Sequence, residues 1–257
     1  MKIIIFSFLI ISLLIMPASG EVKSSLWRTE KSQHFIIYFQ EASDGFINEL
    51  IYKAEDYYNG IVDELGFRRF DFWSWDNRAK IFLYQNSEDF RANTARDNWS
   101  GAVVTVANRT IESFIGQSGF LDSILPHEMA HIIFREFVGQ RIVLPLWIDE
   151  GVACSQEKSY LVGRMKVAKK LILENNYLKF DKLFEIYSLG QEIKPEVFYS
   201  QSASIVNFMI NQYGKESFLD FSRKIRDGVN WQRALFSVYR FNSTYEMEEA
   251  WKAFLLK

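Results

Sequence analysis

The segment Leu125–Phe134, LPHEMAHIIF, contains two of the three histidines in the chain of 257 residues. His127 and His131 are four positions apart, so on an α-helix they project from the same face. Two imidazole nitrogens placed in this way can bind one metal ion. Two core histidines bonded to backbone carbonyls are the alternative interpretation of the same pattern. The apolar residues around the pair predict a long helix that ends at Gly139.

Glu128 follows the first histidine directly and completes an H-E-x-x-H motif, which is the arrangement of zinc hydrolases. It is too close in sequence to be a well-directed third ligand, but it can reach a water molecule on the metal. Two imidazoles and one carboxylate leave a fourth position for that water, whose pKa zinc lowers towards ~7. Glu128 then accepts the proton, and hydroxide attacks a carbonyl carbon. The motif therefore predicts one Zn²⁺ ion and hydrolytic chemistry.

The third ligand decides the type of zinc site. A third histidine at the metzincin spacing is excluded, because Phe134 and Phe137 occupy the corresponding positions. The remaining histidine, His34, lies in a predicted strand far upstream. We expect it to end that strand at the surface, and an oxyanion-donor role for it is a weaker alternative.

Glu150 is the better candidate ligand, nineteen residues after His131, in the segment LPLWIDEGVA. It begins a predicted helix, and charges inside such an apolar run need a reason, which a metal supplies. Asp149 is its rival. Asp149 fits better as a helix cap or as a hydrogen-bond partner of a ligand histidine.

Composition and the N-terminus limit the classes of protein that fit. The formal net charge of −2 gives no basic field for nucleic acid. Residues 1–20 read as a signal peptide with a short apolar run, a proline and small residues before the cut; an uncleaved anchor is the alternative. We therefore expect an exported protein, periplasmic or secreted, without a stable membrane span after cleavage. The single cysteine, Cys154, excludes an internal disulfide and is expected to be a small buried residue.

The periodicity of apolar residues predicts an α+β fold. The expected elements are strands at 34–40 and 78–86, a hairpin within 100–114, and helices at 44–67, 87–94, 122–139, 149–160, 162–174, 196–213, 215–227, 231–239 and 244–256. The basic segment 164–170 is expected to be the solvated face of its helix. These elements predict an N-terminal α+β lobe, residues 21–139, followed by a C-terminal α-helical lobe, residues 140–257.

The order HEMAH, then WIDEGVA, resembles the gluzincin pattern, and the second motif is similar to that of M1-type aminopeptidases. The closer resemblance is to the peptidase MA-like metallohydrolases, small exported bacterial proteins, because it extends to HFIIYF at 34–39 and to YSQSASIVNFMINQYG at 199–214. The resemblance implies a thermolysin-like zincin with the zinc site between its lobes. It also implies His127, His131 and Glu150 as zinc ligands and Glu128 as the general base.

The resemblance suggests further site residues. Related enzymes place a tyrosine from the second lobe near the oxyanion, and Tyr199 is the candidate, although ordinary packing explains it as well. The acidic residue with which M1-type aminopeptidases grip a free amine is missing from 100–108. The strand there can still bind an extended peptide through its backbone or be an ordinary sheet strand. Its candidate residues are Ala102, Val103, Val104 and Thr105.

The leading hypothesis is an exported zinc metallopeptidase of the gluzincin type that acts on a peptide or protein. One alternative is an exported binding module with a structural zinc, for which the retained Glu128 has no use. Another is a zinc amidase or esterase that acts on a non-peptide substrate. The sequence does not predict an oligomeric state.

Overall fold

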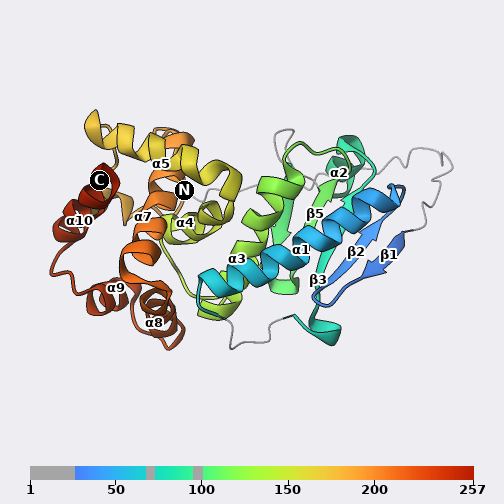
Figure 1. The fold of residues 1–257 in the computed structure, drawn as a ribbon, viewed down its shortest axis with the longest axis horizontal. Coiled ribbons are helices and arrows are strands. Elements are labelled where there is room, and N and C mark those ends of the chain that lie inside the picture. The colour runs from blue at the N-terminus through green and yellow to red at the C-terminus, as the bar shows by residue number, and fades with distance from the viewer. Residues whose placement is uncertain (1–26, 68–72, 95–100) are drawn as a thin grey trace, which may run out of the picture.

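A small β-sheet and a group of helices lie side by side along the long axis of the molecule (Figure 1). The computed structural model describes residues 27–67, 73–94 and 101–257. The signal segment expected at 1–20 lies outside these ranges. Within them, none of the helices combines the length and the hydrophobicity that crossing a membrane requires.

The sheet has five strands in the order β1-β2-β3-β5-β4. Their bounds are β1 Arg28–Lys31, β2 Phe35–Phe39, β3 Ala79–Tyr84, β4 Ala102–Thr105 and β5 Thr110–Phe114. The three central strands run parallel, and each edge strand pairs antiparallel with its neighbour. The sequence predicts all of these strands except β1, whose residues are all exposed and show no apolar alternation. The hairpin β4–β5 leaves β4 at an edge of the sheet.

The two faces of the sheet are covered differently. Phe35, Ile37 and Phe39 of β2 are buried in the main core, which also takes in α1 (Asp44–Glu64) and α3 (Leu125–Val138). The other face carries a smaller cluster of Tyr84, Phe90 and Val103, in which Phe90 comes from α2 (Ser87–Thr94). The sheet therefore packs against α1 and α3, and α3 contains both motif histidines.

Ser43 caps the N-terminus of α1. The Ser43 side chain accepts a hydrogen bond of 3.2 Å from the Phe46 amide, and Asp44 is the first helical residue. On the face of α1 that packs against the core, Ile47 and Tyr58 are buried, whereas Phe46 and Tyr57 are only partly buried.

α3 begins at Leu125, a few residues later than the sequence suggests, because a π-helical turn occupies Phe120–Ile124. Pro126 lies in the first turn of α3, where its missing amide proton costs no helical hydrogen bond. Gly139 ends the helix with a φ of 109°, in the region that favours glycine.

The rest of the chain is helical. Its elements are α4 Leu146–Gln156, α5 Lys158–Leu173, α6 Phe180–Leu183, α7 Pro195–Tyr213, α8 Lys215–Arg226, α9 Trp231–Tyr239 and α10 Thr244–Leu256. Only the four-residue α6 is missing from the prediction, and α4 begins three residues before the expected 149. α7 runs through the middle of this group and packs against α4, α5, α8 and α10 (Figure 1).

α4 and α7 approach each other at Gly151. A Cβ atom on Gly151 would lie 2.7 Å from the Ser202 carbonyl oxygen and 2.8 Å from the Val206 side chain. Only a glycine permits this distance, so α7 fixes the depth at which α4 sits.

Candidate metal centre

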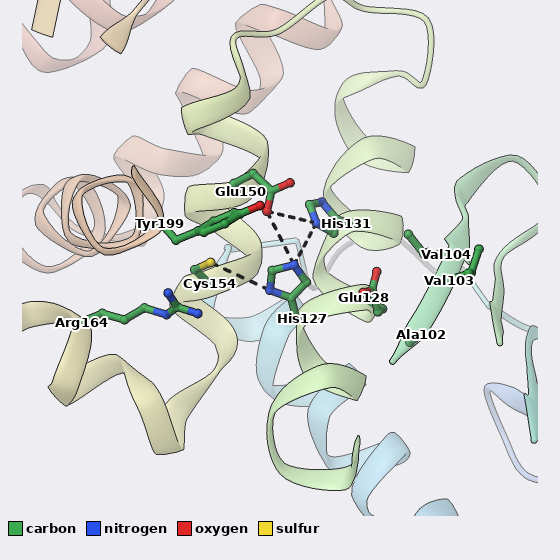
Figure 2. A pocket seen from close by; sticks show the side chains of 10 residues that line it. All are labelled: Ala102, Val103, Val104, His127, Glu128, His131, Glu150, Cys154, Arg164 and Tyr199. Atoms are coloured by element: carbon green, nitrogen blue, oxygen red, sulfur yellow. Dashed lines mark hydrogen bonds and ion pairs between the residues drawn. The ribbon is translucent and has the colours of Figure 1, made fainter. Parts of the chain in front are cut away.

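Three side chains from two helices converge at one point (Figure 2). His127 and His131, one turn apart on α3, bring their Nε2 atoms to 3.2 Å. Glu150, in the second turn of α4, places Oε2 3.6 Å from Nε2 of His127 and 3.8 Å from Nε2 of His131. The structure places the side chains of the three predicted ligands close together, although Glu150 lies inside its helix and not at its start.

The geometry of the three donor atoms fits a zinc ion. Zinc binds imidazole nitrogen and carboxylate oxygen at roughly 2.0–2.2 Å, so two ligands of a tetrahedral ion lie roughly 3.3 Å apart. The observed separations of 3.2, 3.6 and 3.8 Å need only small side-chain adjustments to meet this value. Three protein ligands also leave the fourth position of the tetrahedron free for a water molecule or a substrate.

A cavity of about 430 Å³ opens onto these donors. Its lining residues are Ala102, Val103, Val104, His127, Glu128, His131, Glu150, Cys154, Arg164 and Tyr199. Glu128 projects from α3 on the side that faces β4 (Figure 2). Of the four strand residues proposed for substrate binding, only Thr105 does not line the cavity, because it is exposed at the end of β4.

Tyr199 comes from the first turns of α7, and its hydroxyl group points toward Glu150 and the two histidines (Figure 2). Burial and the neighbouring charge of Glu150 raise the pKa of Tyr199 to about 12. The hydroxyl group therefore keeps its proton at neutral pH and can donate a hydrogen bond into the cavity.

A carboxylate and an arginine orient His127 through Nδ1, the ring nitrogen that faces away from the other two candidate ligands. Nδ1 of His127 lies 2.8 Å from Oε1 of Glu157, and Nη2 of Arg164 donates to both oxygens of Glu157 at 3.0 and 2.7 Å. Burial alone raises the pKa of Glu157, but the bonds from His127 and Arg164 outweigh it and lower the pKa to about 2. Glu157 is therefore ionised and keeps the Nδ1 proton on His127, which turns Nε2 toward the cavity.

His131 is held in a similar way from the other side. Its Nδ1 lies 3.4 Å from Oδ1 of Asp149, and Arg135 donates to Oδ2 of Asp149 at 2.9 Å. The predicted contact between Asp149 and a motif histidine is thus present, and the capping alternative is wrong, because Pro145 is the cap of α4. Burial raises the pKa of Asp149, but His131 and Arg135 lower it to about 2.

Three residues near the metal centre were not assigned to it from the sequence. Cys154 is buried as expected, yet its sulfur lies 3.9 Å from Nδ1 of His127. Glu157 follows Glu150 by seven residues, two helical turns, which was the signal that could have revealed it. Arg164, expected on a solvated face, turns inward because Glu157 attracts it, so that prediction is wrong.

His127, Cys154 and Glu157 also have donor atoms close together. Both oxygens of Glu157 already accept hydrogen bonds from the Arg164 cation, and a metal beside that cation would be repelled. The geometry therefore favours His127, His131 and Glu150 as the metal-binding set.

His34 does not belong to this site. His34 directly precedes β2 in the chain and is buried rather than exposed. Its ring stacks on that of Tyr58 with centroids 4.0 Å apart, and its Nδ1 forms a hydrogen bond of 2.5 Å with Glu55. The expectation that it ends a strand at the surface is wrong, because α1 covers it. It is also absent from the lining of the cavity, so it is not an oxyanion donor.

Comparison with known protein families matches residues 75–257 to the peptidase MA superfamily. The matched segment contains α3 with its H-E-x-x-H motif, α4 with Glu150, and all the later helices. No curated protein sequence matches this chain. The small five-stranded sheet followed by a mostly helical part agrees with the family assignment, which indicates a metallopeptidase-like hydrolase. Since the match extends over well more than half of its length, the chain belongs to the peptidase MA superfamily.

Proposed function

We propose that this protein is a zinc-dependent peptidase of the gluzincin type with a thermolysin-like arrangement. His127, His131 and Glu150 bind the zinc ion in this proposal. One observation carries it: three donor atoms lie 3.2–3.8 Å apart at a cavity that also contains Glu128. Zinc is the typical metal of the superfamily, which supports the choice of ion.

When bound, zinc polarises a substrate carbonyl group and makes a neighbouring water molecule more acidic. Glu128 accepts a proton from the attacking water and passes it to the leaving amine. Tyr199 donates its hydrogen to the oxygen on which negative charge develops, and its raised pKa keeps that hydrogen in place. Glu157 and Asp149 hold the two imidazoles in the orientation that this chemistry needs.

The substrate lies along β4, in our proposal, as an added strand next to the last strand of the described sheet. Ala102, Val103 and Val104 line the cavity next to Glu128 and offer backbone groups to an extended peptide. β4 has the sequence AVVT, without an acidic side chain for a free amine, which argues against aminopeptidase action.

The two alternatives have less support. A structural zinc module needs neither Glu128 nor a cavity that reaches the metal ligands. An amidase or esterase would use the same side chains on a different bond, so the chemical nature of the cleaved bond separates it from a peptidase.

Export and the division into lobes remain proposals. Residues 1–20 have the pattern of a signal peptide, and we propose that the mature protein acts in the periplasm or outside the cell. We likewise propose one lobe at 21–139 and a second at 140–257, with the zinc site between them.

The test uses zinc-loaded protein, a mixed peptide library and the variant Glu128→Gln. We expect cleavage by the wild type, and a kcat lower by about 10²- to 10⁴-fold in the variant, whose zinc content stays at one ion. Glu216→Gln is the matched control, because Glu216 is exposed on α8. Unchanged hydrolysis by Glu128→Gln, or purified protein that binds no zinc, contradicts the proposal.

A further inference from the structure

Arg164 reaches the metal cavity from α5, a helix that contributes no candidate metal ligand. Its guanidinium group points toward Cys154 and His127, on the far side of His127 from Glu128 and β4 (Figure 2). The side chain keeps 22% of its surface exposed and lines the cavity. A fixed positive charge therefore lies at the border of the cavity, on the side of His127 away from Glu128 (Figure 2).

The hydrogen-bonding capacity of Arg164 is only partly used. A guanidinium group has five N–H donors, and Glu157 takes those of Nη2. Nε is buried and has no hydrogen-bond partner. Among the residues that the structure describes, Arg164 donates only from Nη2, to Glu157, so Nη1 is left with no acceptor. Since Arg164 lines the cavity and Nη1 has donors to spare, a ligand oxygen in the cavity can accept a hydrogen bond from Nη1.

We propose that Arg164 is a specificity residue that binds a carboxylate of the substrate; the inference rests on the proposed peptidase function. A carboxylate matches the planar fork of a guanidinium group better than any neutral acceptor does. It can be the C-terminal end of a peptide or the side chain of an aspartate or glutamate.

The position of Arg164 limits where that carboxylate lies along the substrate. Arg164 reaches the metal site through Glu157 and the His127 ring, with links of 3.0 and 2.8 Å, so its Nη2 lies within roughly 10 Å of a zinc ion. An extended peptide rises ~3.3 Å per residue, so the carboxylate belongs to one of the ~3 residues next to the cleaved bond.

Arg135 provides the matched control. It holds Asp149 as Arg164 holds Glu157, but its Nη1 donates to the Ile142 carbonyl oxygen at 2.8 Å, and it does not line the cavity. If Arg164 served only to hold Glu157, its loss would slow the cleavage of every substrate by the same factor. A role in specificity changes the ratio between substrates instead.

The experiment compares two matched pairs of N-acetylated hexapeptide libraries on zinc-loaded protein. One pair differs in a C-terminal carboxylate or amide, and the other, amidated throughout, carries a central glutamate or glutamine. Cleavage gives kcat/KM ratios by mass spectrometry, and binding to the Glu128→Gln variant gives Kd ratios without turnover. Wild type, Arg164→Gln and Arg135→Gln are measured side by side.

We expect wild type to favour the carboxylate member of at least one pair by about 10- to 100-fold, as a charged hydrogen bond allows. Arg164→Gln lowers that ratio to roughly one, whereas Arg135→Gln keeps it. The pair that responds identifies the source of the carboxylate. Absence of any preference in wild type, or an unchanged ratio in Arg164→Gln, overturns the inference. The Kd ratio is measured without hydrolysis. If the protein prefers carboxylates in binding but cleaves no peptide, the proposed peptidase function is refuted and the role of Arg164 in carboxylate binding is not.

Discussion

The two histidines of α3 are held by similar groups that differ in what lies behind them. His127 contacts Glu157 at 2.8 Å, and His131 contacts Asp149 at the longer distance of 3.4 Å. Behind Glu157, Arg164 borders the cavity; behind Asp149, Arg135 is fixed to the Ile142 carbonyl oxygen. We call the first set the open arm (His127, Glu157, Arg164) and the second the closed arm (His131, Asp149, Arg135).

This difference separates two tasks within one centre. The closed arm ties its histidine to the loop between α3 and α4, so it contributes to a fixed metal geometry. The open arm orients its histidine and also brings a positive charge to the border of the cavity. Both arms depend on α4, which carries Asp149 and Glu150 and ends next to Glu157.

The first test of the comparison is the effect of pH on zinc binding. Burial lowers the pKa of each imidazole, but Cys154 and Glu157 at His127, and Asp149 at His131, outweigh it and raise the pKa well above 6.5. With both Nδ1 atoms directed at carboxylates, we expect the two Nε2 atoms, 3.2 Å apart, to share an added proton when no metal is bound. Zinc must displace this proton.

We therefore expect the zinc affinity to rise about tenfold for each pH unit between pH 6 and 8, measured by competition with a chelator. The raised pKa also means that the added proton stabilises the metal-free fold. That contribution is complete below the unfolded pKa of ~6.5 and disappears as the pH rises through the raised pKa. A zinc affinity that does not change over this range contradicts the shared proton.

The second test compares the carboxylates of the two arms directly. We expect Glu157→Gln and Asp149→Asn each to weaken zinc binding by about 10- to 100-fold, because both residues orient a ligand histidine. Glu157→Gln has the larger effect, because its contact with the imidazole is 2.8 Å against 3.4 Å for Asp149. The measurement is zinc affinity at one fixed pH, with Glu216→Gln as the control. A larger loss in Asp149→Asn would mean that the closed arm is the stronger one.

The two arms also show how far sequence reasoning extends. Helical spacing placed His127 and His131 on one face, and charges in an apolar run identified Glu150 and its neighbour Asp149. These inferences use contacts between residues of one helix or rules about local composition. The closed arm lies within twenty residues of the chain, from 131 to 149, so its carboxylate was within reach of such reasoning.

The inward direction of Arg164 in the open arm was not within reach, because it depends on how α4 and α5 lie relative to each other. Arg164 looks like part of a basic, solvated helix face in the sequence, and only the position of Glu157 turns it inward. The same limit explains His34. The sequence suggested an exposed strand end, but Glu55 of α1 packs against His34 and forms a hydrogen bond with it. The strands β2 to β5, which include the hairpin, and nearly all helices were predictable, since their signals are periodic and local.

The smallest expected effect tests the helix that both arms share. In Gly151→Ala the added methyl group would lie 2.7 Å from the Ser202 carbonyl oxygen of α7, so α4 must shift outward. We expect a loss of about 1–3 kcal/mol in the free energy of unfolding. Zinc binding should weaken only a few-fold, because a shift of α4 moves Asp149, Glu150 and Glu157 together. The open arm should still contribute more to zinc binding than the closed arm.

Gly163→Ala is the control for this prediction. Gly163 is exposed on α5, and a methyl group added there would have no atom within 4 Å, so alanine stabilises the helix by about 0.5–1 kcal/mol. Thermal unfolding of the metal-free proteins should therefore give opposite shifts, with a lower Tm for Gly151→Ala and an equal or higher Tm for Gly163→Ala. If both variants unfold at the wild-type temperature, the contact with α7 does not set the position of α4. The idea that α7 positions the carboxylates of both arms through α4 would then be wrong.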